Sequence, residues 1–233
     1  MIRPPTVLVH HGVGDAAPES DPVGLVVPPD KLRSQLRLLL RLGYRFCTAE
    51  DLLADSGPLP PASGTACITF DDGLTSDLHV TAPLLEKLGI RGSFYVCPGL
   101  WGRQHASING DAGRLLDRDG AAELSERGME LGSHAMTHSD LRKLDDAALE
   151  DELAESKSAI EDLTGRPCRV IAYPFGLHDE RVESAAVRAG YELGLGWGPG
   201  HWRREAVPRM PGPPRHGALR LGLKLLGIRR SAR

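Results

Sequence analysis

The sequence lacks any apolar stretch long enough to cross a membrane, and its first residues lack the basic start and small-residue cleavage site of a secretion signal. Acidic and basic residues nearly balance, because the formal net charge is −3 over 233 residues and the two kinds are mostly interspersed. These absences argue against a membrane-spanning protein and against a nucleic-acid-binding surface. We therefore expect a cytoplasmic enzyme or binding protein.

Cysteine is also scarce. The four cysteines, Cys47, Cys67, Cys97 and Cys168, are widely spaced and form no C-x-x-C pair. This spacing has neither the paired motif of a zinc or redox site nor the density of a disulfide-stapled domain. Because each cysteine lies in or beside an apolar run, we predict that all four are reduced residues of the core.

The chain does have a regular alternation of short apolar runs, typical of strands, and longer amphipathic segments, typical of helices. The expected strands cover residues 6–11, 65–70, 91–99, 131–141 (a strand end and loop), 169–176 (a strand that enters a proline turn) and, last, 192–198. The expected helices cover 29–45, 79–90, 119–131, 145–165 and 179–191. This order predicts a single α/β domain with parallel strands, built as a sheet or a barrel. Function should then lie at the carboxyl ends of the strands.

Two adjacent carboxylates, Asp71 and Asp72, follow the expected strand 65–70. Neighbouring side chains of a strand point to opposite faces, so both acids can share a site only where the backbone turns, and Gly73 permits a turn. Two close carboxylates repel each other, and a divalent cation would let both stay ionised. A surface Asp-Gly turn is the ordinary alternative.

Two further polar clusters follow later strands. His134 and His138 are separated by three residues, so both imidazoles can lie on one face of a helical turn and bind zinc or a related metal; a surface or capping role is the alternative. In the segment 172–180, Pro174 and Gly176 flank an aromatic residue. Such a turn can direct backbone N–H groups into a cleft, as in an oxyanion hole, or can serve packing alone.

All three clusters fall at the same end of the expected strands. One carboxylate and two imidazoles, with one position left open for water, form the donor set of a catalytic zinc site. The second carboxylate would then be free to take a proton from a water that the metal activates. Together the clusters predict a catalytic metal site.

The order of T-F-D-D-G, S-H-x-x-x-H and Y-P-F-G resembles the polysaccharide deacetylases, the NodB-homology group of carbohydrate esterase family 4. The resemblance covers nearly the whole chain, and segments 28–53 and 149–176 are similar to the poly-N-acetylglucosamine deacetylase branch. It implies a distorted (β/α)7 barrel in a single domain. It also implies one divalent metal, usually Zn²⁺ but also Co²⁺ or Ni²⁺, and hydrolysis of an N-acetyl group to an amine and acetate.

Carried over by position, the resemblance implies a role for most residues of the three clusters. Asp71 would be the base, and the metal ligands would be Asp72, His134 and His138. The backbone N–H of Phe175 would help hold the oxyanion. Substrate-binding residues would be Tyr173 and Pro174, together with Arg209.

Two motifs depart from the common family pattern. The C-terminal Leu-x-His motif, which carries the general acid, is absent; in the poly-N-acetylglucosamine branch the acid comes from an N-terminal strand, where His10 and His11 match. The resemblance implies His11 as the acid, and purely structural histidines are the alternative. The arginine that usually pairs with the catalytic aspartate is replaced by Ala172, and Arg209 resembles the late arginine of the permuted branch.

We predict a metal-dependent N-deacetylase for an N-acetylglucosamine-type glycan or a lipid-linked or nucleotide-linked N-acetyl sugar, with no nucleic-acid partner. Two alternatives stay open: an amidase of the same fold acting on a cyclic imide or ureide, and a catalytically silent metal-binding module. We expect the barrel to cover residues 1–214. The basic, leucine-rich tail, 215–233, would either lie on an anionic membrane surface or cover the barrel as a last helix.

Overall fold

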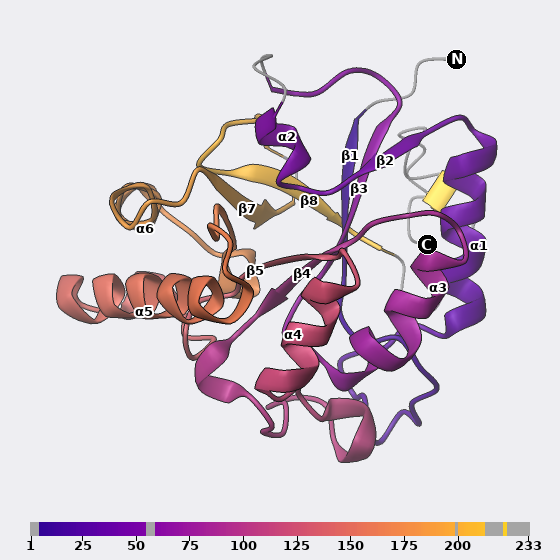
Figure 1. Cartoon of the computed structure of the whole chain (residues 1–233), viewed down its shortest axis with the longest axis horizontal. Coiled ribbons are helices and arrows are strands. Elements are labelled where there is room, and N and C mark those ends of the chain that lie inside the picture. Colours follow the sequence, from indigo (N-terminus) through magenta and orange to yellow (C-terminus); the bar gives the residue numbers. More distant parts are fainter. Residues whose placement is uncertain (1–4, 55–58, 199, 213–220, 223–233) are drawn as a thin grey trace, which may run out of the picture.

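Parallel strands and helices alternate in the computed structural model, which describes residues 5–54, 59–198, 200–212 and 221–222 (Figure 1). The strands are β1 (Thr6–His10), β2 (Arg45–Cys47), β3 (Thr65–Phe70), β4 (Ser93–Val96), β5 (Glu130–Ser133), β6 (Val170–Ala172), β7 (Leu193–Trp197) and β8 (Val207–Pro211). The α-helices are α1 (Pro29–Arg41), α2 (Asp51–Ala54), α3 (Ala82–Glu86), α4 (Arg118–Glu126), α5 (Asp146–Thr164) and α6 (Glu180–Arg188). A π-helical turn, η1 (Asp77–Thr81), leads directly into α3.

Seven of these strands close into a barrel, and every pairing is parallel. The order runs from β3 through β4, β5, β6, β7 and β8 to β1, which pairs with β3 again. β2 lies beside the first residues of β3, and β4 lies beside its last two, so β2 and β4 follow each other along one edge of β3. The predicted distorted (β/α)7 barrel is confirmed.

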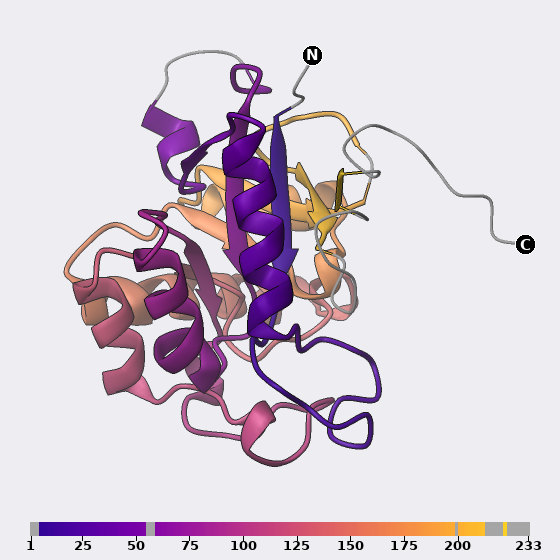
Figure 2. The same cartoon turned by 90° about the vertical axis from the view of Figure 1, so that its right-hand side faces the viewer.

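Helices cover the outside of the barrel through apolar faces. In α1, Leu32, Leu36 and Leu39 recur at helical spacing, are fully buried and join Leu8 and Ile68 in one cluster. Figure 2 shows α1 lying along the strands that carry these two residues, β1 and β3. On the other side, α5 and α6 pack in a second cluster around β6.

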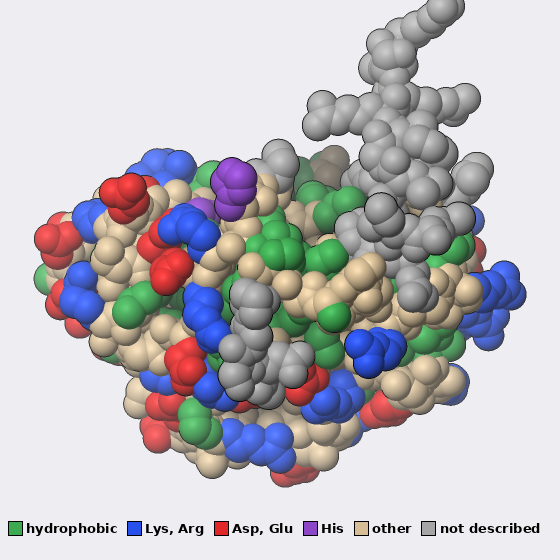
Figure 3. Space-filling view, turned by 90° about the horizontal axis from the view of Figure 1, so that it is seen from above, with side chains coloured by type: hydrophobic (Ala, Val, Ile, Leu, Met, Phe, Trp, Pro, Cys, Tyr) green, Lys and Arg blue, Asp and Glu red, His purple; other side chains and the backbone are tan. Residues whose placement is uncertain are grey.

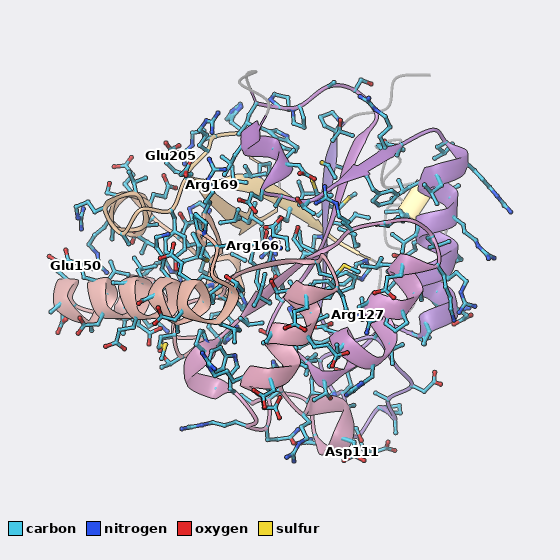
Figure 4. All side chains as sticks on the ribbon, viewed as in Figure 1. Asp111, Arg127, Glu150, Arg166, Arg169 and Glu205 are labelled. Carbon is cyan, nitrogen blue, oxygen red and sulfur yellow. The ribbon has the colours of Figure 1, made fainter. Side chains whose placement is uncertain are left out.

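Two devices fix the ends and the mutual position of these helices. The side chain of Asp145 accepts a hydrogen bond from the N–H of Ala148 and so caps α5, which ends at Gly165 with a φ of 64°. Arg127, at the end of α4, forms two hydrogen bonds of 2.8 and 2.7 Å with Glu86 of α3 (Figure 4). This pair joins neighbouring helices at the surface.

The barrel is filled by side chains and is not a channel. A third cluster gathers residues of six strands together with α2, and it contains Val7, Cys67, Tyr95, Ala172, Leu195 and Val207. Leu52 of α2 belongs to the same cluster, so α2 packs on the barrel, at the end where β1 begins (Figure 1). Seen from that end, the surface carries interspersed basic and acidic side chains (Figure 3).

Several sequence expectations need correction. β2 was not predicted, since the expected helix 29–45 overlaps it at one residue, Arg45, and 192–198 is not the last strand because β8 follows it. The segment 169–176 agrees with its prediction, because the strand ends at Ala172 and a short 3-10 turn begins at Pro174. The four cysteines are free as predicted, with Cys47 only partly buried.

No helix among the described residues combines the length and apolar character that a membrane span requires. The predicted tail 215–233 falls outside the described residues apart from Leu221 and Gly222. Leu221 is fully buried in the cluster that contains the α1 leucines.

Candidate metal centre

The turn after β3 presents two carboxylates at the carboxyl end of the barrel. Asp72 and Gly73 both have positive φ values, 75° and 73°. The left-handed conformation of Asp72 interrupts the alternation of the strand, so that its side chain does not point to the face opposite Asp71. A Cβ at Gly73 would lie 2.8 Å from Val96 Cγ1, so glycine is required there. The predicted turn is present, and it begins at Asp72 itself.

His134 and His138 lie on a loop, and the helical turn expected from their spacing is not formed. β5 ends at Ser133, and Ala135 and His138 have φ values of 61° and 59°. The loop folds back so that the two imidazole centroids lie 4.9 Å apart. The histidines therefore meet by another route than the one expected.

Glu152 of α5 holds this histidine loop in place. Its Oε2 accepts hydrogen bonds of 2.9 Å from the backbone N–H groups of Met136 and Thr137, and its Oε1 contacts the hydroxyl of Thr137. Charge-assisted bonds of this kind are stronger than neutral ones. One helix residue thus satisfies the polar backbone of the loop between the two histidines.

Asp72, His134 and His138 form a cluster whose donor atoms all lie within 4.8 Å of one another. Asp72 Oδ1 is 3.5 Å from His134 Nε2 and 3.3 Å from His138 Nε2. His134 Nδ1 lies 2.6 Å from the carbonyl oxygen of Ala172, which can only accept, so Nδ1 carries the proton and Nε2 offers a lone pair to the cluster.

The donor atoms of this cluster fit a divalent cation. Asp72 Oδ1 is buried and has no hydrogen-bond partner among the described residues. A buried carboxylate oxygen without a partner carries a large free-energy cost that a bound cation would remove. Catalytic zinc sites commonly have three protein ligands and one open position, and two imidazole nitrogens with one carboxylate oxygen are such a ligand set.

The protonation states also suit metal binding. Burial alone would raise the pKa of Asp72, but a hydrogen bond from His105 and the nearby imidazoles lower it well below its ordinary value. Burial, with the neighbouring His134, lowers the pKa of His138 to about 4. At pH 7 the carboxylate is therefore ionised and the His138 imidazole is neutral, as metal ligands must be.

Asp71 forms a buried ion pair with Arg209 of β8. Its Oδ1 and Oδ2 accept hydrogen bonds of 2.7 and 2.8 Å from the two terminal guanidinium nitrogens, and Thr69 accepts a third at 3.1 Å. Burial, the largest single cause, would raise the pKa of Asp71, but the charge and hydrogen bonds of Arg209 together with the nearby His134 and His11 hold the pKa below its ordinary value. Asp71 is thus held as a carboxylate beside the metal cluster, with Oδ2 3.9 Å from His134 Nε2.

The structure separates the two N-terminal histidines. His11 follows β1 and places Nε2 3.9 Å from Asp72 Oδ2, at the open side of the cluster. His10 is buried, stacks on Phe70 and would be touched by any Cβ added at Gly212. Of the pair, only His11 lies at the site.

Two exposed aromatic rings flank the cluster. Phe175 has a φ of 59°, is 49% exposed and contacts the His138 ring at a centroid distance of 4.5 Å. Trp197, at the end of β7, is 40% exposed and lies edge-on to His11 at 5.9 Å. Gly176 follows Phe175, and a Cβ at Gly176 would lie 2.3 Å from Trp197 Cγ. The side chain of Trp197 therefore packs against the backbone beside Phe175. Trp197 belongs to none of the sequence motifs that predicted the site.

The three residues predicted to bind substrate, Tyr173, Pro174 and Arg209, are all buried. The hydroxyl of Tyr173 donates to the carbonyl of Glu205 and its ring lies in the cluster between β6 and the outer helices. Arg209 lies beneath Asp71. Contact of these side chains with a substrate therefore stays a prediction, whereas the pairing of Arg209 with Asp71 is the contact that the family resemblance suggested.

Backbone strain is concentrated at this site. In the part of the chain that the structure describes, the non-glycine residues with positive φ are Asp72, Ala135, His138 and Phe175. Each such residue costs of order 1–3 kcal/mol and persists only where the surroundings enforce it. All four lie in or beside the Asp72–His134–His138 cluster, which makes it the candidate functional centre.

Comparison with known proteins agrees with this geometry. The family model for polysaccharide deacetylases matches residues 60–194. YxkH of Bacillus subtilis (strain 168), whose name assigns it provisionally to the polysaccharide deacetylases, is 25% identical over 200 residues, covering 85% of this chain and 66% of its own length. A chitin deacetylase of a Pestalotiopsis species is 26% identical over 129 residues, covering 55% of this chain and 40% of its own length. The chain thus spans less than two thirds of these relatives.

Solved structures share the fold. The deacetylase PplD of Streptococcus pyogenes, in complex with acetate, superposes with a TM-score of 0.79 at 22% identity, over 97% of this chain and 99% of that one. IcaB from Ammonifex degensii gives a TM-score of 0.73 at 21% identity, over 96% of both chains. At these identities the likeness establishes the barrel and its closure.

Proposed function

Because the chain belongs to the polysaccharide deacetylase family, we propose that it is a metal-dependent hydrolase that removes the acetyl group from an N-acetylated sugar. One observation carries this proposal: the partnerless, buried Oδ1 of Asp72 faces two imidazoles, and a second ionised carboxylate, Asp71, lies directly beside them. A site that only stored a metal would have no use for the second acid.

Asp72, His134 and His138 would hold the metal. When bound, a divalent ion such as Zn²⁺ supplies a Lewis acid that polarises the acetamide carbonyl and makes water more acidic. The partly exposed side chains of His138 and His11, 23% and 14%, leave this side of the cluster open to a substrate.

The neighbouring residues divide the proton transfers of the hydrolysis. Asp71 takes a proton from the attacking water while that oxygen bonds to the acetyl carbon. The N–H of Phe175 donates to the carbonyl oxygen as it gains negative charge. His11 then gives a proton to the nitrogen as the C–N bond breaks, which releases an amine and acetate.

The two exposed aromatic rings beside the cluster, Phe175 and Trp197, support a sugar as substrate. Phe175 lies on the metal side of the cluster and Trp197 lies on the His11 side. Exposed rings of this kind offer flat apolar faces that can pack against the C–H groups of a pyranose. His11, which follows β1, and Arg209 on β8 favour the poly-N-acetylglucosamine branch of the family, and Zn²⁺ is the metal we expect.

The test of this proposal is acetate release by the zinc-loaded protein. N-acetylglucosamine would be offered as free sugar, oligomer, nucleotide-linked sugar and lipid-linked sugar, and we expect acetate from at least one form. Acetate from none of them, with zinc bound, would contradict the proposal and favour the cyclic imide or ureide substrates.

A further inference from the structure

A fourth imidazole, besides those of His134, His138 and His11, reaches the metal cluster from a different part of the chain. His105 lies in the segment between β4 and α4, and its Nε2 is 3.1 Å from Asp72 Oδ2. Its side chain is only 10% exposed. No motif of the sequence analysis included it.

The position of His105 is fixed by its own loop. The backbone N–H of His105 donates to the carbonyl of Gly113 at 2.7 Å. The side chain of Gln104 donates to the carbonyls of Ile108 and Gly110 at 2.6 and 3.1 Å. Gly113 has no room for a side chain, because a Cβ there would lie 1.9 Å from the Ile108 carbonyl oxygen. These contacts hold the loop in one conformation and so fix the place of His105 beside Asp72.

The hydrogen bonds of His105 fix its tautomer. The backbone N–H of Ser107 donates to Nδ1 at 3.0 Å, so Nδ1 holds a lone pair. The ring proton then lies on Nε2 and is donated to Asp72 Oδ2. A nitrogen that carries a proton is not a metal ligand, so His105 acts on the cluster through the carboxylate.

We infer that His105 is a positioning residue that fixes the Asp72 carboxylate so that only Oδ1 is presented to the metal. The two oxygens have different surroundings: Oδ2 accepts from His105, whereas Oδ1 faces His134 and His138 with no hydrogen bond. One-oxygen coordination leaves more of the metal open to water and substrate than a carboxylate bound through both oxygens. The inference rests on the metal site of the proposed function but not on its substrate.

The experiment measures Zn²⁺ affinity of the full chain by competition with a chromophoric chelator, without substrate. His105→Ala should lower the affinity about 10–100-fold, the usual cost of losing an outer hydrogen bond to a metal ligand. His105→Gln keeps an N–H donor close to the position of Nε2, and should bind within about threefold of the native chain. His79→Ala, which removes an exposed histidine, is the matched control and should change nothing.

Thermal unfolding of each zinc-free variant separates loss of the fold from loss of the hydrogen bond. Native affinity in His105→Ala, or equal weakening in His105→Gln and His105→Ala, would overturn the inference. Failure of the native chain to bind zinc would instead contradict the proposed function. Zinc binding without acetate release would leave the role of His105 measurable.

Discussion

At the scale of single residues, the site is a set of buried charges held in different ways. Asp71 is stabilised by Arg209 and Asp72 by a hydrogen bond and nearby imidazoles, so both are ionised. Asp77 is different, because it is fully buried in η1 and its Oδ2 has no hydrogen-bond partner among the described residues. Burial, and next the charge of Asp72, raise the pKa of Asp77 well above its ordinary value.

This raised pKa predicts a pH-dependent gain from Asp77→Asn. The unfolded chain releases the Asp77 proton near pH 4, whereas the folded chain keeps it, so native stability falls as pH rises towards the folded pKa. Asp77→Asn lacks this loss, so its stability relative to the native chain should rise with pH above pH 4, by at most about 1.4 kcal/mol per pH unit, and level off at the folded pKa of Asp77.

Urea unfolding of metal-free protein from pH 4 to 8 measures the Asp77 effect. Asp119→Asn, an exposed acid in the first turn of α4, is the control and should show no such trend. A stability difference for Asp77→Asn that stays constant across this range would contradict a neutral Asp77.

Local patterns in the sequence predict the residues whose chemistry is local. Arg209, the remote partner of Asp71, was suggested only by the family resemblance, and His105 was not predicted at all. Two pairs are recognisable because each follows a strand and its two members are close in sequence: Asp71 with Asp72, and His134 with His138. The partner of Asp71 is 138 residues away, on a strand with proline at two of its five positions, a composition that disfavours the strand assignment. His105 carries no motif, because only the folding of its loop brings it to Asp72.

At the scale of elements, loops anchored to rigid helices create the site. The histidine loop takes two left-handed residues, Ala135 and His138, and depends on Glu152 of α5 for its backbone hydrogen bonds. Spacing alone suggested a helix here, because an i and i+4 pair fits one helical face. The loop geometry prevailed because the N–H groups found a carboxylate on a neighbouring helix.

Glu152→Ala should therefore loosen the histidine loop. We expect a loss of roughly 1–2 kcal/mol in unfolding free energy, since two charge-assisted bonds in a partly exposed loop are removed. Amide hydrogen exchange at Met136 and Thr137 should become faster, and zinc affinity should fall. Glu155→Ala, at an exposed position of the same helix, is the control, and identical exchange in the two variants would contradict this role of Glu152.

At the scale of the whole molecule, barrel closure assembles the site from distant parts of the chain. β1 pairs with both β3 and β8, which brings His11 and Arg209 to the aspartates of β3. Both lie outside the residues matched by the family model, 60–194. The alternation of strands and helices predicted a parallel sheet or barrel, and only the family resemblance implied the barrel. The pairing of the first strand with the last could not be read from local pattern, because it joins the two ends of the chain.

The most direct test of the account compares acetate release and zinc content of the native protein and Asp71→Asn, at one substrate identified in the panel. We predict about one zinc per chain in both, and turnover about 10²–10⁴-fold lower in the variant, the range for loss of a positioned base. A thermal unfolding transition for the variant confirms that it is folded despite the unpaired Arg209. Native turnover in zinc-loaded Asp71→Asn would contradict the role of Asp71 as base and with it the mechanism built on this metal centre.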